Sequence, residues 1–176
     1  GKKSLLDAMA PSEIIDASFT ASTLPNGRPM QDGDALVIAS SGSTGSPKGI
    51  IHTHSSILAG ARASASRLQL SSNDHWLVCI PVSHVGGFSV VARALHTGAA
   101  LTLLPAFDAA AVQEAAKNGA THTSLVATAL SRIDASLFRT ILLGGSSAPT
   151  NLPSNVITTY GMTETGGGAV HNGEPL

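Results

Sequence analysis

Short apolar runs alternate with longer amphipathic stretches along most of the chain. Because short apolar segments bounded by Gly, Pro, Ser or Asn are typical of buried strands, we predict strands at 35–39, 50–52, 75–80, 100–104, 122–126, 140–143 and 155–159. Helical spacing of apolar residues predicts helices at 55–70, 88–96, 108–117 and 127–133. The alternation predicts an α/β fold with a mostly parallel, helix-covered sheet.

The N-terminal stretch is less regular. Residues 4–15 give only a weak helical pattern, which Pro11 interrupts, and residues 19–34 are polar and rich in Pro, Gly and Asn, which is typical of turns. We therefore expect an N-terminal arm at 1–34 and a core at 35–176. In the first helix of that core, the apolar face should contain Leu58, Ala61, Ala65 and Leu68.

Polar or glycine-rich stretches follow four of the predicted strands directly, at 41–49, 81–87, 144–149 and 160–164. In a parallel sheet, ligands collect beyond the carboxyl ends of the strands. These four stretches are therefore the candidates for a binding site.

The first of them, at 41–49, contains Gly, Ser and Thr and ends in Pro47-Lys48-Gly49. Glycines let the backbone approach an anion, hydroxyls donate hydrogen bonds, and a lysine adds a positive charge, so the stretch suits a phosphate. It is not a P-loop of the GxxxxGK[ST] kind, since Lys48 follows a proline and no Ser or Thr comes next. The alternative is a flexible surface loop.

Composition narrows the class of partner. The 176 residues are 43% hydrophobic and 3% aromatic, with a formal net charge of −1, so a globular domain with an aliphatic core is expected and neither nucleic acid nor a membrane is favoured. No apolar segment approaches the roughly 20 residues of a membrane helix. The single cysteine, Cys79, lies in an apolar run; we expect a buried thiol and a reducing, cytoplasmic compartment.

The stretch Tyr160-Gly161-Met162-Thr163-Glu164 offers a ring that can stack on a base, a hydroxyl, and a hard oxygen ligand for Mg²⁺. The alternative is a surface glutamate after a strand. Taken alone, the Gly-Gly step at 144–145 is equally consistent with a plain turn.

Histidines give weaker signals. His84 precedes Gly86 and Gly87 on an expected pocket loop, although a lone histidine is more often structural. His52 and His54 have the spacing of one strand face, but no third metal ligand is apparent, which favours packing or surface roles.

The first stretch and Tyr160–Glu164 together resemble the adenylate-forming superfamily of acyl- and aryl-CoA synthetases, luciferases and peptide-synthetase adenylation domains. This resemblance implies ATP and Mg²⁺ as cofactors. It implies that Ser41, Gly42, Ser43, Thr44, Gly45 and Lys48 hold the β- and γ-phosphates. It further implies that Gly144, Gly145 and Gly161 border the adenine, that Tyr160 stacks on it, that Thr163 contacts the α-phosphate, and that Glu164 binds Mg²⁺.

Three stretches, at 80–88, 121–130 and 159–176, are most similar to the o-succinylbenzoate–CoA ligases of menaquinone biosynthesis. By that likeness a small carboxylic acid binds near His84, Gly86, Gly87, Ser124 and Leu125. The implied reaction joins acid and ATP into an acyl-adenylate, which coenzyme A converts to a thioester. His84 should shape or gate the acid site and not act as a base, since the acid is already ionised. The residues implied to act in catalysis are Lys48, Thr163, Glu164 and His84.

Relatives of this kind continue past the glutamate into a Thr-Gly-Asp segment, a hinge and a small C-terminal domain, and most have a longer N-terminal subdomain. None of these is found in the chain, so we expect weak ATP binding and slow or no adenylation. The alternatives are another aryl- or acyl-CoA ligase, a non-catalytic nucleotide-binding remnant, and half of an enzyme completed by a separate C-terminal chain. Exposed strand edges would favour a homo-oligomer.

Overall fold

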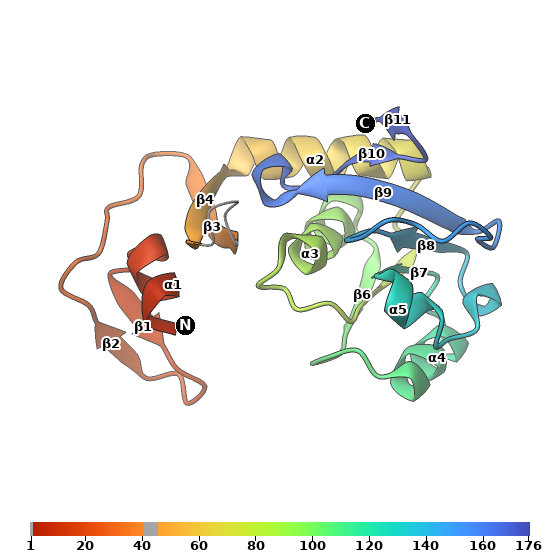
Figure 1. Cartoon of the computed structure of the whole chain (residues 1–176), viewed down its shortest axis with the longest axis horizontal. Helices are drawn as coiled ribbons and strands as arrows, with labels where there is room; N and C mark the ends of the chain where they lie inside the picture. Colours follow the sequence, from red (N-terminus) through yellow and green to blue (C-terminus); the bar gives the residue numbers. More distant parts are fainter. Residues whose placement is uncertain (1, 41–45) are drawn as a thin grey trace. The chain divides into compact units, whose positions relative to one another are not determined.

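The computed structural model describes residues 2–40 and 46–176. The chain divides into two compact units, Gly1–His54 and Ser55–Leu176, which are described separately here (Figure 1). The division into an arm at 1–34 and a core at 35–176 stays a prediction.

The first unit consists of a short helix and two antiparallel strand pairs. Helix α1 (Lys2–Met9) contacts strands β3 (Asp34–Ser40) and β4 (Lys48–Thr53), which pair antiparallel, and β1 (Glu13–Ile15) pairs antiparallel with β2 (Ala21–Thr23). The predicted strands at 35–39 and 50–52 are confirmed. The prediction of turns throughout 19–34 was wrong for β2, because its three polar or small residues are all exposed and show no alternation.

The second unit is built on a seven-stranded sheet with the order β11-β10-β9-β8-β7-β5-β6. Its strands are β5 (His75–Val78), β6 (Ala100–Leu103), β7 (His122–Leu125), β8 (Thr140–Leu143), β9 (Val156–Met162), β10 (Gly167–His171) and β11 (Glu174–Pro175). The five strands from β5 to β9 are parallel, and β10 and β11 are antiparallel additions. The predicted α/β fold with a mostly parallel sheet is confirmed. The two last strands were not predicted, because glycines at 166–168 read as a loop.

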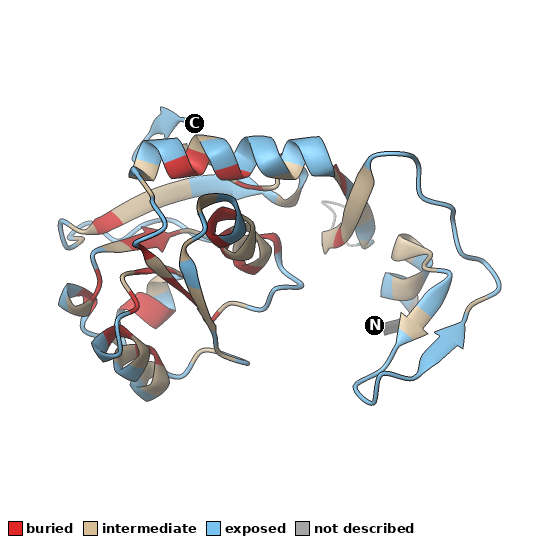
Figure 2. Cartoon of the chain, turned by 180° about the vertical axis from the view of Figure 1, so that it is seen from behind, coloured by how far each residue is buried: buried red, intermediate tan, exposed pale blue. Residues whose placement is uncertain are grey.

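Helices cover both faces of this sheet (Figure 1). Helix α3 (Val85–Thr97) and the end of α2 (His54–Leu68) pack against one face, where Trp76 and Val78 of β5 point. The helices α4 (Ala109–Lys117) and α5 (Ala127–Leu130) cover the other face, which carries Leu77. Successive residues of β5 thus serve two separate cores. Figure 2 shows the buried residues along the strands and on the inward sides of these helices.

Two helix ends show common capping features. Gly98 ends α3 in the left-handed conformation with φ of 70°, and the Asp108 side chain accepts a hydrogen bond from the Ala111 N–H at 2.8 Å at the start of α4. On α2, Ala61 and Ala65 are buried as expected, but Leu58 is 40% exposed, so its predicted inward position was wrong. Ser64 is buried on that face as well.

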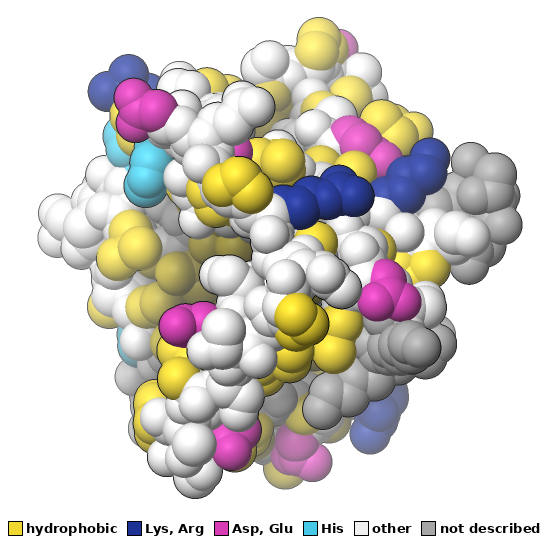
Figure 3. All heavy atoms as spheres, turned by 90° about the vertical axis from the view of Figure 1, so that its left-hand side faces the viewer, with side chains coloured by type: hydrophobic (Ala, Val, Ile, Leu, Met, Phe, Trp, Pro, Cys, Tyr) yellow, Lys and Arg dark blue, Asp and Glu magenta, His cyan; other side chains and the backbone are white. Residues whose placement is uncertain are grey.

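Other expectations can be compared with single residues. Cys79 is buried and unpaired, and burial raises the pKa of its thiol. His52 belongs to β4 whereas His54 begins α2, so they do not share a strand face, and no cluster of three metal-binding side chains occurs among residues 2–40 and 46–176. Within that same part of the chain, no helix combines the length and apolar character needed to cross a bilayer. The face in Figure 3 carries both acidic and basic side chains, among hydrophobic and uncharged ones.

Candidate functional site

A cavity of about 550 Å³ opens where the parallel strands of the second unit end. The segments that follow β5, β7 and β8 line it, together with the start of α3 and parts of β9 and β10. This is the edge of the sheet at which the strand topology predicts ligand binding. The residues Ile80, Ser124, Val126 and Gly144 mark the strand ends around it.

Four of the five residues predicted to contact the acid line this cavity, namely His84, Gly86, Ser124 and Leu125. The fifth, Gly87, does not line it. A side chain at Gly87 would overlap the carbonyl oxygens of Ile80 and Pro81, so the glycine allows the start of α3 to pack closely on the loop after β5.

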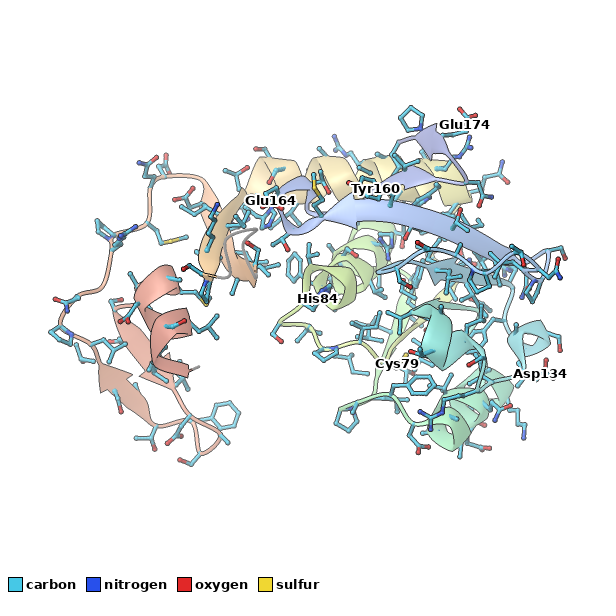
Figure 4. All side chains as sticks on the ribbon, in the orientation of Figure 1. Cys79, His84, Asp134, Tyr160, Glu164 and Glu174 are labelled. Carbon is cyan, nitrogen blue, oxygen red and sulfur yellow. The ribbon has the colours of Figure 1, made fainter. Side chains whose placement is uncertain are left out.

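His84 begins α3. Its backbone is extended, and its Nδ1 accepts a hydrogen bond from the Gly86 N–H at 3.0 Å. This bond satisfies one of the free N–H groups of the first helical turn. His84 is exposed and lies at the N-terminal end of α3 (Figure 4). It therefore caps the helix and also forms part of the cavity wall.

Arg93 is the one charged side chain on the cavity wall among the described residues, and sequence reasoning missed it. It is 4% exposed, and its guanidinium lies 4.8 Å from the centroid of the Trp76 ring. Its Nη2 donates a long hydrogen bond of 3.4 Å to Ser124 Oγ, while its Nε has no partner. No carboxylate within residues 2–40 and 46–176 pairs with it.

Burial lowers the pKa of Arg93 to about 10, so the guanidinium is still protonated at neutral pH. A buried cation without a counter-ion is unfavourable, and an anion entering the cavity would relieve that cost. The sequence signal was present: Arg93 stands between Val90 and Ala94, two buried residues of the same helix face. A charge on an otherwise apolar face is a reason to look for a ligand.

His171 was also missed. It ends β10, is 1% exposed and lines the cavity, and neither ring nitrogen has a hydrogen-bond partner among the residues that the structure describes. The failure to predict β10 hid this residue, because without the strand there was no reason to place a histidine after three glycines inside the molecule.

We predicted that the Tyr160–Glu164 stretch follows a strand, but part of it belongs to the strand itself. Residues 160–162 are part of β9, and Thr163 and Glu164 form the 3-10 helix η2 (Thr163–Thr165), after which β10 returns antiparallel. Tyr160 is 64% exposed, and Glu164 is exposed at the end of β9 (Figure 4). The Glu164 carboxylate has no hydrogen bond or ion pair to any described residue, which leaves both oxygens available to a hard cation.

The glycines predicted to border the adenine have packing functions of their own. Gly144, Gly145 and Gly161 all line the cavity. A side chain at Gly144 would come within 2.6 Å of Thr159 Oγ1, and one at Gly161 would overlap the backbone of Gly167 across the hairpin. Gly145 has a φ of +84°, which favours glycine.

The predicted phosphate loop falls largely outside the described residues, which exclude Ser41, Gly42, Ser43, Thr44 and Gly45. Lys48 is exposed and is the first residue of β4. The loop connects the two strands of the antiparallel hairpin β3–β4 in the first unit. The expectation that it follows a strand of the parallel sheet was therefore wrong.

Comparison with known proteins identifies the family. The model of the AMP-binding enzyme family matches residues 3–176, almost the whole chain. The chain belongs to the AMP-binding enzymes. Members similar to it include the 2-succinylbenzoate–CoA ligase of Bacillus anthracis (strain A0248), 37% identical over 145 residues, or 73% of this chain and 30% of the relative. Another is a probable 2-succinylbenzoate–CoA ligase of Mycobacterium tuberculosis (strain CDC 1551 / Oshkosh), 34% identical over 85% of this chain and 44% of the relative.

Solved structures of this AMP-binding family agree. The o-succinylbenzoate coenzyme A synthetase of Bacillus subtilis in complex with ATP and magnesium ion matches with a TM-score of 0.72 and 28% identity, over 85% of this chain and 35% of that one. The same enzyme with the acyl-adenylate intermediate OSB-AMP also gives a TM-score of 0.72, over 80% of this chain and 34% of that one. The chain thus spans less than half the length of the relatives it matches.

Proposed function

We propose that this chain is the acid- and nucleotide-binding part of an ATP-dependent acid–CoA ligase whose substrate is 2-succinylbenzoate. In the first step a carboxylate oxygen of the acid attacks the α-phosphorus of ATP, giving the acyl-adenylate and pyrophosphate. In the second, the thiolate of coenzyme A attacks the acyl carbon and AMP leaves with the electron pair of the broken C–O bond. Proteins contribute to such transfers mainly by positioning and charge neutralisation.

The observation that carries this proposal is the buried guanidinium of Arg93 on the cavity wall, which forms no ion pair with any described carboxylate. 2-Succinylbenzoate has two carboxylates, one on the ring and one at the end of the succinyl chain. If one reacts with ATP, the other needs a counter-charge, and Arg93 is suited to supply it. A monocarboxylic acid would leave the guanidinium without a partner.

His84 fits this reaction as a wall residue. Its Nδ1 already accepts the Gly86 N–H, so only the opposite nitrogen can face a ligand. No base is needed, because a carboxylic acid is ionised at neutral pH. In the proposal His84, Gly86, Ser124 and Leu125 shape the acid cavity, and Gly87 acts indirectly by fixing the start of α3.

The nucleotide part of the proposal assigns phosphate contacts to residues 41–45, Lys48 and Thr163, and adenine contacts to Tyr160 and the three glycines. Glu164 would hold Mg²⁺: its carboxylate is exposed and unpaired among the described residues, and Mg²⁺ binds proteins through one or two carboxylates together with substrate phosphates and water. When bound, Mg²⁺ neutralises phosphate charge.

The test has two measurements on the 176-residue chain. Isothermal titration with 2-succinylbenzoate should show one site, and acid-dependent exchange of labelled pyrophosphate into ATP should show adenylation. Glu164→Gln should abolish exchange without changing binding of the acid alone. Absence of any acid binding would refute the proposal. Binding without exchange would assign the chain to a binding part that needs further segments for chemistry.

A further inference from the structure

The imidazole of His171 lies in the acid cavity with nothing to bind. It is 1% exposed, and within the described part of the chain both ring nitrogens lack a hydrogen-bond partner. A buried polar atom without a partner is costly, and such atoms are rare in folded proteins. Because His171 is also part of the cavity wall, a ligand is the natural source of the missing bond.

The neighbours of His171 in the β9–β10 hairpin define the surroundings of its imidazole. His171 pairs with Thr159 across the β9–β10 hairpin, and a side chain at Gly168 would come within 3.3 Å of His171 Nε2. The absence of a side chain at Gly168 therefore keeps the space beside Nε2 open. Another buried histidine, His122, differs on this point: its Nδ1 lies 2.8 Å from Thr121 Oγ1, and it does not line the cavity.

His171 and Arg93 affect one another. Burial, together with the positive charges of Arg93 and Arg67, lowers the pKa of His171 to about 4. The imidazole is therefore neutral at pH 7, with one N–H donor and one acceptor nitrogen. The cavity wall thus presents a cation and a neutral donor together, with the Ser124 hydroxyl already bound to the cation.

We propose that His171 is a specificity-determining residue that donates an N–H hydrogen bond to the second carboxylate of the acid, the group that Arg93 neutralises. A carboxylate has two oxygens and several acceptor positions, so one can face the guanidinium while the other accepts from the imidazole. This inference rests on the proposed function, and it assigns selection of dicarboxylic over monocarboxylic acids to a pair of residues.

The experiment compares two acids of nearly the same shape. 2-Succinylbenzoate and 4-(2-methylphenyl)-4-oxobutanoate share the chain carboxylate and the ketone, but only the first has a second carboxylate, on the ring. The wild-type chain should bind 2-succinylbenzoate more tightly by isothermal titration. His171→Phe, which keeps a flat ring but no donor, should reduce that preference roughly ten- to hundredfold and leave the affinity for 4-(2-methylphenyl)-4-oxobutanoate unchanged.

Two controls separate recognition from a structural role. His171→Gln keeps an N–H donor and should retain much of the preference, whereas a purely structural role would make both variants equally defective for both acids. In the wild-type chain with ¹⁵N-labelled histidine, the His171 ring signal, assigned by its absence in His171→Phe, should move on addition of 2-succinylbenzoate and stay in place with 4-(2-methylphenyl)-4-oxobutanoate. The corresponding signal of His122 should not move with either acid.

The outcomes distinguish the two proposals. An unchanged preference in His171→Phe, or a His171 signal that ignores 2-succinylbenzoate, overturns the role of His171 and leaves the ligase proposal standing. Equal affinity of the wild-type chain for both acids also overturns it. Failure of the wild-type chain to bind either acid overturns both proposals.

Discussion

Replacing Arg93 should stabilise the free protein and should also remove the proposed binding of a dicarboxylic acid. Burial lowers the pKa of this guanidinium from its ordinary value to about 10. At about 1.4 kcal/mol per pKa unit, the folded state carries roughly 3 kcal/mol of unfavourable free energy for the charge. Because the folded pKa lies below the unfolded one, this cost is fully present at pH 7 and is relieved only as the pH rises through 10.

Two interactions offset part of that cost. The guanidinium lies 4.8 Å from the Trp76 ring centroid, a cation–π contact of about 1–2 kcal/mol when desolvated, and the 3.4 Å hydrogen bond to Ser124 Oγ is long and weak. Arg93→Met removes the charge and keeps a long apolar side chain. We expect a net gain of about 1–2 kcal/mol in the free energy of unfolding, which raises Tm by a few degrees in a protein of this size.

The assay is thermal unfolding by circular dichroism with and without 2-succinylbenzoate. Without the acid, Arg93→Met should melt above the wild-type chain, and Arg93→Lys, which keeps a buried charge and loses the planar fork, should melt below it. With the acid at high concentration, the wild-type Tm should rise and that of Arg93→Met should not. If both substitutions lower Tm by similar amounts, packing and not charge governs this position, and the reasoning is refuted.

Further predictions concern pH, a close backbone contact and a buried carboxylate. The pKa values of His122 and His171 are both lowered to about 4, against 6.5 for an ordinary histidine, so between pH 4 and 6.5 the unfolded state binds more protons than the folded state. The free energy of unfolding should therefore be at its full value above about pH 6.5 and fall as the pH drops towards about 4. A urea midpoint that is equal at about pH 7 and about pH 5 would contradict this prediction. Gly87→Ala should lower the free energy of unfolding by about 1–3 kcal/mol, since the added methyl would meet the carbonyl oxygens of Ile80 and Pro81. As a control in the same urea titration, Gly60→Ala in α2 should raise the free energy of unfolding by up to about 1 kcal/mol, because no described atom lies within 4 Å of the added methyl. Asp74 is 1% exposed and accepts hydrogen bonds from the Ser71 N–H at 2.7 Å and from Arg139, so Asp74→Ala should lower the free energy of unfolding by about 2–3 kcal/mol. Because Arg139 is largely exposed, Arg139→Ala should lower it by less than about 1 kcal/mol in the same measurement.

The elements that the sequence predicted well are those whose local signals agree with their burial. The parallel strands β5, β6 and β8 are short, mainly apolar runs, and Gly98 and Asp108 mark helix ends through backbone conformation and hydrogen bonding. These signals depend on neighbouring residues only, so a single sequence contains them. The cavity at the strand ends followed from the same topology.

What the sequence did not predict depends on distant parts of the chain. β10 has three glycines near its start and forms because β9 offers a partner, a fact invisible in the local pattern. The position of Arg93 beside Val90 and Ala94 indicated an apolar helix face, but only the structure places Trp76 and Ser124 next to its guanidinium. His171 could be recognised as a buried residue only after β10 had been identified as a strand. Leu58 has the spacing of a buried helix position, but no described element covers it in the structure, where it is 40% exposed.

The hairpin of β9 and β10 contains an irregularity with a wider meaning. Gly168 pairs with Gly161, but Val170 pairs with Tyr160, so the register shifts at Ala169. Ala169 is thus the extra residue of a β-bulge, and a bulge bends its strand and re-aims the side chains beside it. Deleting Ala169 would leave His171 opposite Thr159 but remove this bend, and so change the direction of the imidazole without altering a single contact residue. If His171 selects the acid as proposed, that selection depends on the spacing of a strand, where a comparison of site residues alone would overlook it.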